Sequence, residues 1–172
     1  MLSTILVSYP WLTTAAFLSL VLLGPVLGSR LVSRPRVTTA LLVLAGAAVV
    51  LLTLMPTSRV LDVGCAVEWS LPQLGAVEHM ANIILFVPVV LLAGVLTGRP
   101  LLAFGAASGL SILIEAVQAF VPVLGRSCST NDWLANTLGA LLGAVLAVVA
   151  LRRSRARAAQ ETTTVGDPVA SW

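Results

Sequence analysis

The stretch that decides the fold is Glu115–Gly143, EAVQAFVPVLGRSCSTNDWLANTLGALLG, because it sets polar groups between two long apolar segments. Apolar segments of this length are typical of membrane-spanning helices, where an ionisable group at the centre costs about 3 kcal/mol on insertion scales. The polar and charged residues of the stretch include Glu115, Gln118, Arg126, Asn131, Asp132 and Asn136. Such groups need partners inside the protein, a hydrated cavity or a function.

The composition of the whole chain indicates an integral membrane protein. The 172 residues are 58% hydrophobic and 10% charged, whereas a soluble domain is about half apolar and about a quarter charged. The mean hydropathy is +1.02. This length accommodates about five spans joined by short loops and leaves no room for an independent soluble domain. We therefore predict an all-α, polytopic membrane helix bundle with about five transmembrane helices.

Prolines and polar loops divide the apolar sequence into spans. We expect spans near residues 9–27, 37–55, 78–96, 101–121 and 133–151. Pro25 is expected to bend or end the first span, whereas Pro56 and Pro122 end the second and fourth. Residues 1–151 thus form the bundle, and residues 152–172 form a tail that is basic at first and then disordered.

The distribution of arginine predicts the orientation of the bundle. All the basic residues are arginine, and the first loop, the third loop and the tail hold eight of them. The second and fourth loops hold only Arg59 and Arg126. Because cytoplasmic loops carry an excess of basic residues, we expect the N-terminus outside and the C-terminus in the cytoplasm. Basic blocks beside apolar spans favour contacts with membrane lipid headgroups rather than with nucleic acid.

The only cysteines, Cys65 and Cys128, both fall in loops that we expect outside the cytoplasm. Thiols there tend to oxidise, so we predict a Cys65–Cys128 disulfide; the alternative is two unrelated free thiols. One histidine and two cysteines exclude a bis-histidine haem and a cysteine-rich zinc or iron–sulfur site. We expect no cofactor and no metal site, because no recognised ligand motif accompanies Glu115, Asp132 and His79.

Helical spacing brings the polar residues of three spans onto facing stripes, because residues three or four positions apart share one face of a helix. The stripes are Ser108, Ser111, Glu115 and Gln118 on the fourth span, Asp132, Asn136, Gly139 and Gly143 on the fifth, and His79, Asn82 and Phe86 on the third. Each stripe is polar toward its outer end. We therefore predict one polar site just beneath the outer surface, to which the first two spans contribute no such residues. The two glycines are expected mainly to let helices pack closely.

Two runs of sequence resemble the VanZ-like family of membrane proteins. The run NIILFVPVVLLAGVL, residues 82–96, is similar to the N-x3-F-x-P span of that family. The elements E-x2-Q at 115–118, Arg126 and D-x3-N-x2-G-x3-G at 132–143 are similar to its second signature. The resemblance covers residues 78–150, with Val90 standing where the family usually has glycine. It implies a multi-pass protein of the bacterial cytoplasmic membrane, associated with tolerance of teicoplanin-type glycopeptides.

The candidate ligand-binding residues are the polar side chains of these spans and of the fourth loop. They are Asn82, Glu115, Gln118, Arg126, Asp132 and Asn136. Glu115 is the strongest candidate, because a carboxylate inside a membrane marks a functional site by default. The alternative for Glu115 is a structural lock, with Gln118, Asn82 or Arg126 as its partner. Arg126 could pair with Asp132 or Glu115, or bind a lipid phosphate, and Asp132 could cap the fifth helix.

Three functions are compatible with these residues. The first is binding or repositioning of an envelope lipid headgroup, with membrane lipids, a cell-wall lipid precursor or a glycopeptide as partners. The second is an enzyme acting on a lipid-linked phosphate or acyl group, with Glu115 or Asp132 as the catalytic acid or base. No recognised nucleophile or zinc-hydrolase motif supports it. The third is a structural or partner-binding membrane protein whose polar residues only hold the helices together.

Overall fold

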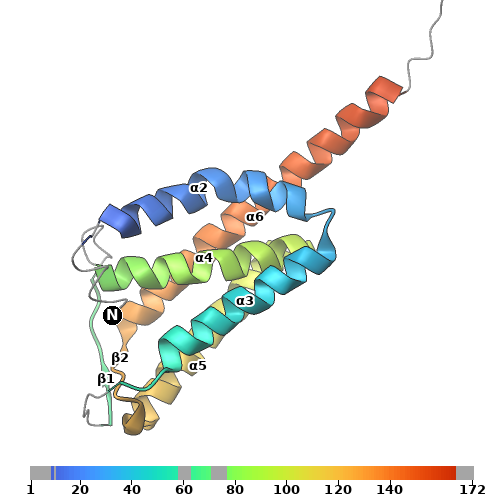
Figure 1. Cartoon of the computed structure of the whole chain (residues 1–172). Helices are drawn as coiled ribbons and strands as arrows, with labels where there is room; N and C mark the ends of the chain where they lie inside the picture. Colours follow the sequence, from blue (N-terminus) through green and yellow to red (C-terminus); the bar gives the residue numbers. More distant parts are fainter. Residues whose placement is uncertain (1–8, 10, 58–62, 71–76, 166–172) are drawn as a thin grey trace, which may run out of the picture.

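The structure, a computed structural model, describes residues 9, 11–57, 63–70 and 77–165. Its five long helices are α2 (Trp11–Leu31), α3 (Pro35–Leu54), α4 (Val77–Thr97), α5 (Pro100–Phe120) and α6 (Thr130–Val165). The remaining elements are the short strands β1 (Cys65–Ala66) and β2 (Cys128–Ser129) and the 3-10 turn η1 (Pro122–Leu124). The five helices are all long and apolar enough to cross a membrane. The predicted membrane helix bundle is confirmed (Figure 1).

Two helices run farther than the predicted spans. Helix α2 continues through Pro25 to Leu31, so Pro25 does not end it. Helix α6 continues beyond the expected span to Val165, and the arginines that follow Leu151 are helical. Arginine, alanine and glutamine are good helix formers, and this stretch is rich in them. Residues 166–172, the rest of the tail predicted to be disordered, lie outside the described residues.

Successive helices run in alternating directions across the bundle (Figure 1). Short turns at residues 32–34 and 98–99 join α2 to α3 and α4 to α5, and short connections favour antiparallel neighbours. Each turn is followed by a proline at the start of the next helix, where the missing N–H costs nothing. We name the two ends by their residues. The disulfide end holds Cys65 and Cys128, and the arginine end holds Arg30, Arg34, Arg36, Arg99 and Arg152.

Helix α4 lies at the centre of the bundle and contributes to both apolar clusters of the core. On one side, Ile83, Val87 and Leu91 pack with buried residues of α6, and with partly buried residues of α2. On the other side, Phe86 and Val90 pack with buried residues of α3, α5 and α6. The side chain of Phe86 is fully buried. Because α4 contacts every other long helix, its polar first turn can meet partners from several directions.

Helix α6 approaches α4 closely through its two glycines. A Cβ atom on Gly139 would overlap the carbonyl oxygen of Ile83, and one on Gly143 would lie 2.6 Å from the carbonyl oxygen of Val87. Side chains at these positions are therefore excluded by the α4 backbone. The prediction that the glycines serve close packing is confirmed, and small residues are the usual device for such contacts in membranes.

The outer faces of α3 and α5 are apolar and exposed. They include Leu41, Val43, Leu44, Leu51, Leu101, Leu102, Ile112, Leu113 and Phe120. Soluble monomers rarely expose contiguous apolar patches larger than a few hundred Å². These faces are the surface that acyl chains would cover in a membrane.

Candidate functional site

The disulfide end is built on a covalent link between two loops. Cys65 and Cys128 form a disulfide, with 4.6 Å between their Cα atoms. The prediction of this disulfide from the placement of the two cysteines is confirmed. The strands β1 and β2 pair in parallel at the same place, with Cys65 opposite Cys128 and Ala66 opposite Ser129. The loop that follows α3 is thus attached to the segment that leads into α6.

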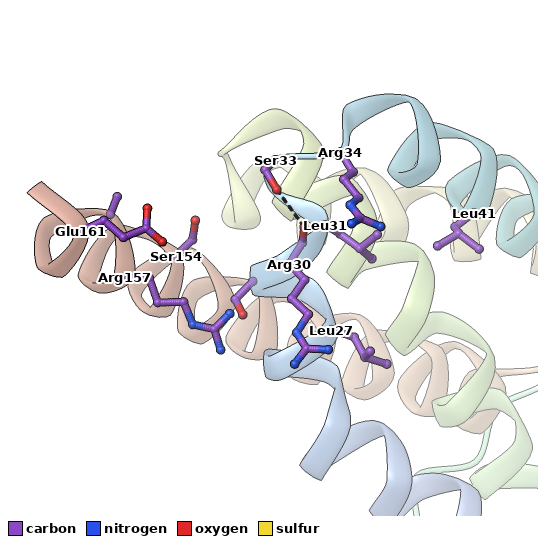
Figure 2. A pocket seen from close by; sticks show the side chains of 11 residues that line it. Leu27, Arg30, Leu31, Ser33, Arg34, Leu41, Ser154, Arg157 and Glu161 are labelled. Carbon is purple, nitrogen blue, oxygen red and sulfur yellow. Dashed lines mark hydrogen bonds between the residues drawn. The ribbon is translucent and has the colours of Figure 1, made fainter. Parts of the chain in front are cut away.

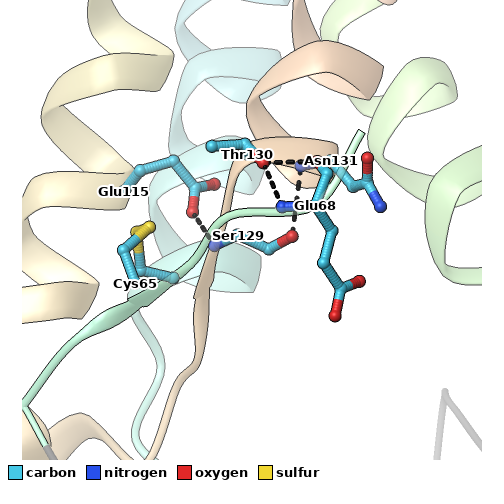
Figure 3. The surroundings of a disulfide bond; sticks show 7 residues. Cys65, Glu68, Glu115, Ser129, Thr130 and Asn131 are labelled. Atoms are coloured by element: carbon cyan, nitrogen blue, oxygen red, sulfur yellow. Dashed lines mark hydrogen bonds between the residues drawn. A yellow bond between two sulfur atoms is a disulfide. The ribbon is translucent and has the colours of Figure 1, made fainter. Parts of the chain in front are cut away.

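Side chains at the start of α6 extend this attachment (Figure 3). The backbone N–H of Glu68 donates to the Thr130 hydroxyl over 2.8 Å, and that hydroxyl donates to the Glu68 carbonyl. Asn131 accepts from the Ser70 N–H over 2.9 Å and donates to the Ser70 hydroxyl over 3.0 Å. These paired bonds hold residues 68–70 against the first turn of α6.

Ser129, and not Asp132, caps the start of α6. The Ser129 hydroxyl accepts a hydrogen bond from the Asn131 N–H over 3.1 Å, which satisfies one of the free donors of a helix N-terminus. Helix α6 begins at Thr130, so Asp132 lies inside its first turn. The alternative in which Asp132 caps this helix is therefore not the one observed, because the helix begins two residues before it.

Glu115 lies buried on α5, with 8% of its surface exposed. Its Oε2 atom accepts a hydrogen bond from the Ser129 N–H over 3.0 Å (Figure 3). The lock predicted with Gln118, Asn82 or Arg126 is therefore not the one observed, because the partner is a backbone amide. No hydrogen bond from a described residue reaches Oε1. Glu115 therefore holds Ser129, the residue next to Cys128, against α5.

Asp132 joins α6 to α4. Its Oδ1 atom accepts from Asn82 Nδ2 over 2.8 Å. The pairing of Arg126 with Asp132 or Glu115 that the sequence suggested is wrong. The Arg126 Nε atom instead donates to the carbonyl of Met55 over 3.2 Å. The backbone carbonyls at the C-terminal end of a helix have no hydrogen-bond donor within that helix. The Met55 carbonyl, just after α3, therefore accepts a hydrogen bond from a side chain outside it.

Gln118 meets the same end of α3. Its Nε2 atom donates to the carbonyl of Thr53 over 2.9 Å. The first two spans were expected to contribute nothing to the site, but α3 contributes the backbone oxygens of Thr53 and Met55. Sequence reasoning missed them because it followed side chains only. The signal was Pro56, which ends the helix and leaves these carbonyls free.

Asn136 joins α6 to α5 deeper in the bundle. Its Nδ2 atom donates to the Ser111 hydroxyl over 2.9 Å, and both residues are buried. One turn farther along, the hydroxyls of Ser108 and Thr137 lie 3.2 Å apart. Ser108, Ser111, Glu115 and Gln118 therefore share one face of α5, as the spacing predicted.

Three buried polar atoms near these residues have no hydrogen-bond partner among the described residues. They are His79 Nδ1, Trp133 Nε1 and Asn136 Oδ1. His79 and Glu115 both interact electrostatically with Asp132, and the ring of Trp133 meets that of Trp69 edge to face at 6.2 Å. Within the described ranges, no three His, Cys, Asp or Glu side chains gather closely enough to hold a metal ion.

The apolar helices and the spacing of their polar residues agree with one protein family. The model of the VanZ/LLP1 family matches residues 42–151. The chain belongs to the VanZ/LLP1 family. This match begins within α3, earlier than the predicted resemblance at 78–150, and contains all six candidate site residues. No curated protein and no solved structure gives a significant match to this VanZ/LLP1 chain.

Proposed function

We propose that this VanZ/LLP1 protein binds the polar headgroup of an envelope lipid at its disulfide end, in the outer leaflet of the bacterial cytoplasmic membrane. Binding would displace or mask a lipid-linked precursor of the cell wall and thereby raise tolerance of teicoplanin-type glycopeptides. Glu115, Asp132, Asn82 and Asn136 would be the polar contacts. Gln118 and Arg126, which donate hydrogen bonds to the end of α3, would hold α3 in place beside these contacts.

Two independent features support this orientation. Disulfides persist where the environment is oxidising, outside the cytoplasm, and the Cys65–Cys128 bond lies at one end of the bundle. Eight of the ten arginines lie at the other end, in or next to the two short turns and in the extension of α6, and basic residues are concentrated on the cytoplasmic side of membrane proteins. Both arguments support a position of the candidate site in the outer leaflet, and they use different residues.

The observation that supports binding most directly is the set of unpaired buried polar atoms. More than nine in ten buried polar groups of proteins have a hydrogen-bond partner. Here His79 Nδ1, Trp133 Nε1 and Asn136 Oδ1 lack one among the described residues. The hydroxyl and phosphate oxygens of a lipid headgroup offer both donors and acceptors to such atoms, and Glu115 Oε1 adds a carboxyl oxygen.

A structural role is the second candidate, and a separate observation favours it. The side chains of Asn82, Gln118 and Asn136 each donate to a group on another helix. Bonds of this kind hold membrane helices together. In this reading the polar residues stabilise the bundle, and the activity lies in a surface that contacts a partner.

The substitution Glu115→Gln separates the two candidates. Glutamine keeps an oxygen that accepts from the Ser129 N–H, so we expect normal abundance and an intact disulfide. It removes the charge, so glycopeptide susceptibility of a complemented deletion strain should return to that of the uncomplemented strain. The measurement is the growth-inhibiting teicoplanin concentration, with protein level checked on a blot. Arg126→Ala, tested in the same way, is expected to lower abundance because it removes a bond to the end of α3.

Glu68→Gln is the matched control, because the Glu68 carboxylate is exposed and points away from Glu115 (Figure 3). Complementation should remain complete in that variant. Full complementation by Glu115→Gln at normal abundance would contradict headgroup binding through the carboxylate and favour the structural role. Turnover of a lipid-linked phosphate by the purified protein would favour the enzymatic alternative, with Glu115 or Asp132 as acid or base.

A further inference from the structure

A concave site lies at the arginine end, at the opposite end of the bundle from Glu115 and Asp132. It is a pocket of about 700 Å³ between the turn that joins α2 to α3 and the part of α6 that extends beyond the bundle. Its polar wall includes Arg30, Arg34 and Arg157, and its apolar wall includes Leu27 and Leu41 (Figure 2). Cavities of this size are typical of small-molecule sites.

The polar wall concentrates positive charge from three elements of the fold. Arg30 lies in the last turn of α2, Arg34 lies just before α3, and Arg157 lies on α6. Figure 2 shows the Arg157 guanidinium extending toward Arg30 and away from Glu161, the one carboxylate among the residues that line the pocket. Like charges brought together repel each other, so an anion between them would stabilise the arrangement.

The donors of this wall are suited to a phosphate. A guanidinium presents a planar fork of N–H groups that matches phosphate oxygens. The hydroxyls of Ser29 and Ser33 already donate to the carbonyls of Val26 and Arg30. The arginines and the Ser154 hydroxyl, which also lines the pocket, are therefore the groups left to recognise the anion. A site in which arginine is the main donor favours phosphate over an uncharged headgroup.

The apolar wall shows which kind of phosphate fits. Leu27 is 52% exposed and Leu41 39% exposed, on helices whose outer faces are apolar. An inorganic phosphate would leave these side chains without a contact. A phospholipid would place its phosphate among the arginines and its acyl chains against the leucines. Basic pockets between transmembrane helices on the cytoplasmic side are known places for anionic headgroups.

We infer that this pocket binds an anionic phospholipid of the cytoplasmic leaflet, through a phosphate held by Arg30, Arg34 and Arg157 and acyl chains that lie on Leu27 and Leu41. The site is separate from the proposed outer site, and neither depends on the other. Anchoring by such a lipid would fix the extended part of α6 to the α2–α3 turn.

Lipid binding by the purified full-length protein tests this inference. Vesicles of phosphatidylglycerol mixed with phosphatidylcholine serve as the probe, and vesicles of phosphatidylcholine alone serve as the blank. Bound phosphatidylglycerol is counted by native mass spectrometry after release. The triple variant R30Q/R34Q/R157Q should bind it at least roughly tenfold more weakly, because it removes the three guanidinium groups that would hold the phosphate.

The matched control is R36Q/R99Q/R153Q, which removes the same charge from exposed arginines at the same end that do not line the pocket. It should bind phosphatidylglycerol within about twofold of the wild type, because the pocket is untouched. Equal losses in the two triple variants would overturn the inference in favour of general charge attraction, and no loss in either would overturn it outright.

Folding and soluble anions are checked in the same preparation. An intact Cys65–Cys128 disulfide and an unchanged melting temperature show that the pocket variant is folded. If it is not, the single substitution Arg157→Gln, on the exposed extension of α6, replaces it and should still weaken binding. Displacement of the lipid by millimolar inorganic phosphate would overturn the lipid assignment, whereas retention of the lipid supports it.

Discussion

At the scale of single residues, the site is a set of side chains that satisfy the free ends of neighbouring helices. Gln118 and Arg126 donate to the Thr53 and Met55 carbonyls at the end of α3. Glu115 accepts from the Ser129 N–H at the start of α6. In a membrane a backbone group without a partner is costly, so each of these polar side chains stabilises a helix end as well as a contact.

The substitution Gln118→Leu tests this role. Leucine keeps the approximate volume but removes the donor, and the Thr53 carbonyl is left without a partner in apolar surroundings. We expect a loss of about 0.6–1.7 kcal/mol of stability, the range of hydrogen bonds between membrane helices. Thermal unfolding in detergent measures it. The control is Val117→Ala, which alters an exposed neighbour on α5 and should change stability by less; an equal loss there would contradict the argument.

The sequence predicted where the polar side chains of the site lie, but not all of the groups that they contact. Asn82, Asp132, Asn136 and Glu115 were placed at one end of three adjacent helices by helical spacing alone. Their partners were missed where the partner is a backbone group, as for Glu115 and the Ser129 N–H, because every residue has the same backbone groups. Spacing along one helix shows which face is polar, but which backbone group meets that face depends on how the helices pack.

At the scale of elements, the contact between α4 and α6 organises the bundle. Gly139 and Gly143 bring the two backbones together beside the Asn82–Asp132 bond. The close approach keeps the polar first turns of both helices in register. It also puts Asn136 within reach of Ser111 on α5.

The substitution Gly139→Ala is expected to separate these helices. Its methyl group would overlap the Ile83 backbone, which cannot move without displacing α4, so we expect a loss of about 1–3 kcal/mol, the usual cost of overpacking. Thermal unfolding and the yield of folded protein measure the effect. On α5, Gly105→Ala meets nothing within 4 Å and should be neutral or slightly stabilising. Similar losses in both variants would show that α4 and α6 do not require the glycine contact.

Helix ends were less predictable than helix positions. The apolar pattern gave all five helices, and Pro56 and Pro122 marked the ends of α3 and α5 closely. For α6 the pattern showed where the apolar part ends near Leu151, but the helix continues to Val165. Hydropathy shows which part of a helix is apolar enough to lie in lipid. Helix propensity decides how far the backbone remains helical beyond that part.

At the scale of the whole molecule, the two ends of the bundle differ in how they are held. The disulfide end is linked covalently and by hydrogen bonds between loops. The loop residue Thr57 adds a bond from its N–H to the Leu124 carbonyl over 2.9 Å. Among the described residues, the arginine end is held by the short turns, the extension of α6 and a bond from the Thr38 hydroxyl to the Leu31 carbonyl. We expect the disulfide end to be the more rigid of the two.

Loss of the disulfide tests this difference. In the double variant C65S/C128S, we expect the helices to remain inserted, because each is apolar enough to span on its own. Stability should fall by about 2–4 kcal/mol, the typical contribution of a disulfide, and protease should cut near residues 63–70 sooner. Addition of a reductant to the wild type should reproduce the effect, and no added effect is expected in the double variant. Unreduced wild type that reacts with two equivalents of a thiol reagent would contradict the disulfide.

One consequence follows from the unbroken course of α6. Asp132 and Arg157 lie on the same helix, about 38 Å apart at 1.5 Å per residue. A helix clamped by a neighbouring backbone along its middle transmits tilt or translation as a stiff rod does. We therefore expect a tilt of its first turn to move the arginine end as well, which would connect the two ends of this protein mechanically.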